Sequence, residues 1–95
     1  MKIERLPPEI GGMRKLRVLD LDDNLLTKIP NEIGNLSKLG RLHVSRNNLS
    51  TLPPGIGMLY SLKHLWLSFN TFSELPIEIG CLTNLISLQL NDNMV

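Results

Sequence analysis

The sequence predicts an α/β solenoid of four coils, in which a short strand alternates with a short helical or 3₁₀ segment. Two observations lead to this prediction. Apolar and turn-forming residues recur every 23 positions without insertion or deletion, and a period of about 20 to 50 residues is typical of repeat architectures. Aromatic residues make up only 4% of the chain while leucine is heavily used, which favours a regular core over an irregular one.

The repeats cover residues 6–28, 29–51, 52–74 and 75–95. Six columns, meaning sets of positions 23 residues apart, never vary, and four further columns stay apolar. In the first repeat the invariant columns are Pro7, Ile10, Gly11, Leu16, Leu19 and Asn24, and the apolar ones are Leu6, Met13, Leu21 and Leu26. We therefore predict one domain over 1–95. Because the fourth repeat stops two residues short, the sequence suggests a fragment of a longer array.

Each half of the repeat has its own periodicity. Leu19 and Leu21 are spaced as on a strand with one buried face. Pro7 suits a turn or a helix start, since proline fixes φ and lacks an amide donor. Ile10, Met13 and Leu16 follow at intervals of three, as on one side of a 3₁₀ or short helical segment. The strand and the helical segment therefore alternate once in each repeat.

Glycine and asparagine occupy positions where side-chain chemistry limits the choice of residue. Gly11 and its equivalents predict either a close approach of neighbouring coils or a positive φ. Asn24 and its equivalents follow the strand, and an amide that both donates and accepts can satisfy buried backbone groups where the chain turns. One repeat has too few apolar side chains to offset the entropy of ordering it, so burial between stacked repeats must supply the rest.

Composition excludes several other classes of protein. Ten Lys/Arg stand against nine Asp/Glu, a net charge of +1. A nucleic-acid binder shows a basic surplus on one face, and none is visible in the sequence. No apolar run approaches the roughly 18 to 20 residues of a membrane span. The single cysteine, Cys81, cannot form an internal disulfide. We therefore expect a cytoplasmic protein with no nucleic-acid or membrane partner and no cofactor.

The columns Leu16-x-x-Leu19-x-Leu21-x-x-Asn24-x-Leu26 resemble the leucine-rich-repeat signature, and the segment 52–59 (LPPGIGML) is similar to the 23-residue intracellular subtype. That subtype occurs in Ras-group repeat proteins, in Scribble-like scaffolds and in arrays that precede some Roc-type GTPase and kinase domains. The resemblance implies a right-handed β-α superhelix with a parallel sheet on its concave face. It also implies protein recognition through that face, with a small GTPase or another signalling protein as partner.

The variable positions of the concave face form a grid, because residues 23 apart stack on neighbouring strands about 4.8 Å apart. Its columns are Val18/Arg41/His64/Ser87, Asp20/His43/Trp66/Gln89, Asp22/Ser45/Ser68/Asn91 and, at the rim, Asp23/Arg46/Phe69/Asp92. The grid has an acidic end in the first repeat and an aromatic, weakly basic centre. We predict that the partner binds Asp20, Asp22, Arg41, His43, Arg46, His64, Trp66, Phe69 and Gln89.

Trp66 is the strongest single candidate on this grid. It is the only tryptophan, strand alternation points it away from the core, and tryptophan is enriched at binding hot spots. One hypothesis makes it the anchor for a protein partner. The alternative is that Trp66 only packs over its neighbours His43 and Gln89.

Catalytic and metal-binding readings are less favoured. His43 and His64 lie on adjacent strands with Asp20 near, but a zinc site needs at least one more ligand, and solvent-exposed polar residues explain them more simply. Ser45 and Ser68 offer hydroxyls, but we expect no pocket and no oxyanion donors beside them. We therefore predict no catalytic residue and no metal ligand.

The sequence thus predicts a protein–protein interaction module in intracellular signalling or scaffolding that is not an enzyme. An alternative is a non-catalytic targeting or regulatory arm of a larger kinase, GTPase or ubiquitin ligase. In a third reading the piece has no independent function. The sequence leaves the oligomeric state and the partner open.

Overall fold

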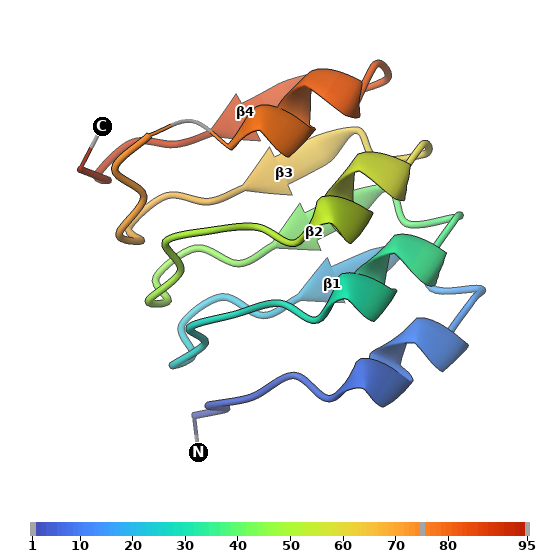
Figure 1. Cartoon of the computed structure of the whole chain (residues 1–95), viewed down its shortest axis with the longest axis horizontal. Coiled ribbons are helices and arrows are strands. Elements are labelled where there is room, and N and C mark those ends of the chain that lie inside the picture. The colour runs from blue at the N-terminus through green and yellow to red at the C-terminus, as the bar shows by residue number, and fades with distance from the viewer. Residues whose placement is uncertain (1, 75, 95) are drawn as a thin grey trace.

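The computed structural model describes residues 2–74 and 76–94, which form a stack of four coils (Figure 1). Each coil contributes one 3₁₀ helix and one three-residue strand. The helices are η1 (Pro8–Gly12), η2 (Asn31–Asn35), η3 (Pro54–Met58) and η4 (Ile77–Cys81), and the strands are β1 (Val18–Asp20), β2 (Arg41–His43), β3 (His64–Trp66) and β4 (Ser87–Gln89). The predicted α/β solenoid is confirmed.

The four strands form one parallel sheet in the order β1-β2-β3-β4. The register is that of the 23-residue period, with Leu19 opposite Leu42 and Leu42 opposite Leu65. Trp66 pairs in turn with Gln89. The grid of columns predicted for the concave face is therefore the observed arrangement.

The helical segments are 3₁₀ helices because hydrogen bonds join residues three apart along each of them. In the first coil the Ile10 N–H donates to the Pro7 carbonyl, Met13 to Ile10, and Leu16 to Met13, at 3.0 to 3.1 Å. This ladder explains why the apolar positions Ile10, Met13 and Leu16 recur at intervals of three. In Figure 1 the helices line the side of the coils opposite the strands.

The invariant glycine column allows a close approach of coils and needs no positive φ. A Cβ added to Gly34 would lie 2.6 Å from the carbonyl oxygen of Gly55 in the next coil, and one added to Gly11 would lie 2.8 Å from that of Glu32. The described glycines all have negative φ. Of the two roles predicted for this column, the close approach is confirmed and the positive φ is wrong.

The core runs through the two inner coils and thins at the ends. Leu42 and Leu65 are fully buried, whereas Leu88 in the same column is 37% exposed. Met13 is 53% exposed although its equivalents Leu36 and Leu59 are fully buried. The outer coils lack a neighbour on one side, so their apolar columns stay open. Leu75 and Val95, which the sequence places in apolar columns, lie outside the described residues.

Among the described residues there is no helix both long and apolar enough to cross a membrane.

Candidate functional site on the concave face

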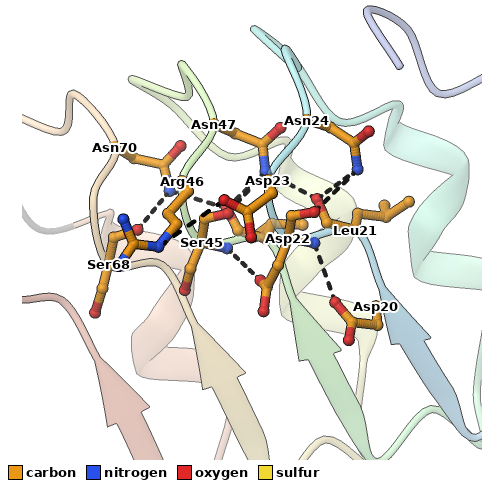
Figure 2. A network of polar contacts seen from close by, with 11 residues as sticks. Asp20, Leu21, Asp22, Asp23, Asn24, Ser45, Arg46, Asn47, Ser68 and Asn70 are labelled. Atoms are coloured by element: carbon orange, nitrogen blue, oxygen red, sulfur yellow. Dashed lines mark hydrogen bonds and ion pairs between the residues drawn. The ribbon is translucent and has the colours of Figure 1, made fainter. Parts of the chain in front are cut away.

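The invariant asparagine column forms the turn that follows the strand in each repeat (Figure 2). The Asn47 amide group donates to the carbonyl oxygens of Leu21, Val44 and Ser45 at 3.0 to 3.2 Å, and its Oδ1 accepts from the Leu26 N–H at 3.0 Å. Asn70 repeats this pattern one coil further on. The prediction that stacked asparagines satisfy buried backbone groups is confirmed, and the column is scaffold rather than recognition surface.

The residue before each asparagine adopts a left-handed conformation, which the sequence did not indicate. These residues have φ near 60° and are Asp23, Arg46, Phe69 and Asp92. Such a φ is uncommon outside glycine. The neighbouring coil holds the inner copies in place, since the Arg46 N–H donates to the Ser68 carbonyl and that of Phe69 to the Asn91 carbonyl. The rim side chains of Arg46 and Phe69 therefore project from backbone that is hydrogen-bonded to the next coil.

The structure brings most of the predicted binding residues onto one face, but with unequal exposure. Asp22, His64 and Trp66 are half-buried and His43 is buried. The remaining five are exposed: Asp20, Arg41, Arg46, Phe69 and Gln89. The expectation that the histidines are solvent-exposed is wrong for His43, because the indole of Trp66 covers its ring.

His43 and Trp66 stack face to face at the centre of this face. Their ring centroids lie 3.8 Å apart and the planes are within 5° of parallel. The predicted packing between these neighbours therefore exists. His43 Nε2 and Trp66 Nε1 are both buried without a hydrogen-bond partner, and an unmade buried hydrogen bond costs about 1 to 3 kcal/mol. The two unpaired nitrogens therefore offset part of the stability that the stacked rings contribute.

Phe69 and Arg46 form a second aromatic pair at the rim. The Arg46 guanidinium carbon lies 4.2 Å from the centre of the Phe69 ring, within the range of a cation–π interaction. The same guanidinium lies 3.9 Å from the Asp23 carboxylate, an exposed pair that adds little stability. Phe69 nevertheless keeps 40% of its surface exposed. The pair leaves an apolar ring available beside a fixed positive charge.

The acidic end of the face lies in the first coil (Figure 2). The Asp22 carboxylate accepts from the Ser45 N–H at 2.7 Å, and the Asp20 carboxylate accepts from the Asp22 N–H at 3.0 Å. Burial raises the pKa of Asp22 above its ordinary value, and the charges of Asp20 and Asp23 act in the same direction. The Ser45 hydrogen bond and the charge of His43 oppose this shift without cancelling it.

The ligand atoms of Asp20, Asp22 and His43 lie within 4.8 Å of one another, so these are the described residues that could hold a cation. His64, which the sequence grouped with His43 and Asp20, is not part of this set. Within this set His43 Nδ1 lies 3.9 Å from Asp20 Oδ2.

A concentration of positive charge along one edge escaped the sequence analysis. The four segments that lead into the strands are residues 14–18, 37–41, 60–64 and 83–87. They hold six of the ten Lys/Arg residues of the chain and none of its nine Asp/Glu residues. The expectation that no basic surplus collects on one face is therefore wrong. Counting charge by repeat column would have found it, but the net charge of +1 hides it.

The chain belongs to the leucine-rich-repeat family, because a family model for leucine-rich repeat regions matches residues 1–93. The fold and the asparagine turn described above support the same family assignment. A comparison with curated proteins found no match. Leucine-rich repeats generally serve as non-catalytic modules for protein–protein interaction.

Solved structures agree with this assignment. A leucine-rich-repeat protein of Leptospira interrogans superposes with a TM-score of 0.93 at 38% identity, over 97% of this chain and 24% of its own. An internalin of Listeria monocytogenes gives 0.85 at 28% identity, over 97% and 26%. A plant peptide hormone receptor in complex with RGF2 gives 0.81 at 34% identity, over 93% and 15%. The chain therefore spans between 15% and 26% of the length of these proteins.

Proposed function

We propose that this chain is a protein-recognition module that binds its partner through the concave face, with Trp66 as the central anchor. The observation that carries the proposal is the pair of supported aromatic rings in the third coil. Trp66 lies flat against His43, and Phe69 lies against Arg46 while 40% exposed. Family membership supports a protein partner in preference to a small molecule.

Prior ordering makes these rings suited to binding. A side chain that is already held in place loses less conformational entropy when a partner covers it. Aromatic and arginine side chains near the centre of an interface carry a large share of binding energy. The acidic Asp20 and Asp22 at one end give the face a charge gradient along the stack, which would orient a partner with a basic segment.

Size limits the affinity that this module reaches alone. A standard interface buries about 800 Å² on each partner, and four coils offer only a short strip. We therefore expect modest affinity from these coils alone. One similar structure, the plant receptor, is in complex with RGF2, which supports binding of a polypeptide. A cytoplasmic role in signalling or scaffolding belongs to the proposal and is supported by the resemblance to the intracellular subtype.

Paired affinity capture tests the proposal. The baits are the wild-type chain, Trp66→Ala and Ile77→Ala, the last a matched control because Ile77 is a large apolar residue of η4, 88% exposed and away from the strands. Circular dichroism confirms that all three are folded. We expect a protein captured by wild type and Ile77→Ala but lost with Trp66→Ala, and its purified form to bind Trp66→Ala at least about tenfold more weakly, as for a hot spot. Equal binding by all three baits would remove Trp66 from the interface.

A further inference from the structure

The charges of this molecule are separated by its fold. We define the basic edge as residues 14–18, 37–41, 60–64 and 83–87, where each coil enters its strand. The edge carries six positive side chains and no negative one, so the rest of the chain holds four positive and nine negative residues. The six are Arg14, Lys15, Arg17, Lys38, Arg41 and Lys63. A molecule of almost neutral net charge therefore has one strongly positive side.

Stacking converts these separate segments into one continuous surface. In Figure 1 the four turns that lead into the strands lie one above another along the right side of the molecule. Arg17, Lys38 and Lys63 come from three successive coils and line a single shallow groove, together with Gly40, Ser61 and Asn84. The sequence separates these residues by more than 20 positions, and only the solenoid brings them together.

The positive charges of the edge are free of intramolecular partners. All six side chains are exposed, and the ion pairs found within residues 2–74 and 76–94 involve His43 and Arg46 instead. Like charges collected at this density repel one another. The arrangement therefore does nothing for the fold, and an anionic partner would remove the repulsion.

The polar groups in the groove distinguish between kinds of anion. Ser61 donates its hydroxyl proton to the Ser37 carbonyl at 2.7 Å, and Asn84 donates through Nδ2 to the Tyr60 carbonyl at 2.7 Å. These bonds leave the Ser61 oxygen and Asn84 Oδ1 free to accept. A polypeptide backbone supplies N–H donors to such acceptors, whereas phosphates supply acceptors only.

We propose that the basic edge binds an acidic segment of a protein partner in extended conformation. Its carboxylates pair with Arg17, Lys38 and Lys63 across the coils, and its backbone N–H groups donate to Ser61 and Asn84. Arg41 and His64 belong both to this edge and to the concave-face grid, but Arg17, Lys38 and Lys63, which carry the proposal, lie outside the grid. The groove and the Trp66 anchor can therefore engage different segments of one partner or act independently.

Fluorescence anisotropy with a labelled peptide of six Glu-Ala repeats tests the proposal on the full chain. The edge variant is Arg17→Gln/Lys38→Gln/Lys63→Gln. The matched control is Lys2→Gln/Arg5→Gln/Lys28→Gln, which removes the same charge from exposed residues outside the edge. We expect the edge variant to weaken binding at least about tenfold and the control less than about twofold. Wild-type binding should weaken as salt is added, because surface charge is screened.

Three outcomes would overturn the proposal. The first is no peptide binding by wild type at low salt. The second is equal weakening in both triple variants, which would assign the effect to net charge alone. The third is an oligonucleotide of equal charge that binds as tightly and depends on the same three residues, which would replace the acidic polypeptide with a nucleic acid. Trp66→Ala should leave peptide binding unchanged, so failure here is distinguishable from failure of the concave-face proposal.

Discussion

The sheet has a leaving side, where the chain leaves each strand, and an entering side, where the chain enters it. The two sides differ in whether their polar side chains have partners within the molecule. On the leaving side, Asn47 and Asn70 are buried and each makes four hydrogen bonds to backbone groups. On the entering side, the lysines and arginines of the basic edge are exposed and have no ion-pair partner among the described residues.

This difference follows the repeat. The asparagine column is the same in all four coils, while the columns of the basic edge that hold its charged residues vary from coil to coil. The invariant asparagines of the inner coils make their hydrogen bonds within the molecule. The variable lysines and arginines of the basic edge leave their charge open to solvent. The invariant columns therefore hold the fold, and the variable columns are free to specify a partner.

The largest expected effect is the loss of one inner asparagine. Asn47→Ala leaves the buried Leu26 N–H without a partner and removes one of the two donors from the carbonyl oxygens of Leu21, Val44 and Ser45, so we expect it to lose about 3 kcal/mol of unfolding free energy. Asn48→Ala is the matched control, because Asn48 is exposed and adjacent, and it should change stability by less than about 0.5 kcal/mol. Urea unfolding followed by circular dichroism measures both. Similar losses from the two variants would break the comparison.

Two glycines allow a second comparison between an invariant and a variable column. Gly34 stands in the invariant column and Gly12 in a variable one. A Cβ at position 34 would meet the Gly55 carbonyl oxygen at 2.6 Å, while one at position 12 has no neighbour within 4 Å. We expect Gly34→Ala to cost about 1 to 3 kcal/mol by forcing the coils apart, and Gly12→Ala to cost nothing. Melting temperatures of the two variants would show this, and equal values would argue against close coil contact.

Substitution of Trp66 should affect partner binding more than the stability of the fold. It belongs to a variable column, makes no hydrogen bond through Nε1 and is only half-buried. We expect Trp66→Ala to lower the unfolding free energy by about 1 to 3 kcal/mol, because it removes both the aromatic pair and the burial of part of the ring, and to leave the chain folded while partner binding is lost. If Trp66→Ala instead unfolds the chain, the His43–Trp66 stack is part of the scaffold.

The smallest effect concerns the charge of Asp22. Its pKa is raised by burial in the folded state, so the folded state holds the proton more firmly than the unfolded state does. The resulting contribution to stability is present below the ordinary value of 3.8 and is lost as pH rises through the folded-state pKa. Asp22→Asn should therefore be more stable than wild type at neutral pH, by an amount that disappears in acid. A variant less stable at neutral pH would mean that the Ser45 hydrogen bond to the carboxylate dominates.

The repeat made the fold predictable from sequence. A period of 23 residues specified the register of the sheet, and Leu19 and Asn24 indicated the buried face and the turn. The exposure of Met13 was missed because its column is buried elsewhere and only the end of the stack leaves it open. The left-handed Arg46 was missed because arginine carries no local signal for positive φ, which the neighbouring coil imposes here.

The recognition surfaces were only partly predictable. Register alone placed Trp66 beside His43, but whether the two rings stack or separate depends on side-chain rotation that periodicity does not describe. The burial of His43 follows from that rotation. The basic edge can be predicted only by counting charged residues column by column across the four repeats, because stacking brings equivalent positions together. Lys38 and Lys63 are neighbours in the groove only after the coils stack.

Urea unfolding of the edge variant Arg17→Gln/Lys38→Gln/Lys63→Gln beside Asn47→Ala tests the central claim most directly. If invariant columns hold the fold and variable columns serve recognition, the triple variant keeps the wild-type unfolding free energy or gains slightly from reduced repulsion. Asn47→Ala alone loses about 3 kcal/mol. A triple variant that loses as much stability as Asn47→Ala would contradict the division of labour between the two sides of the sheet.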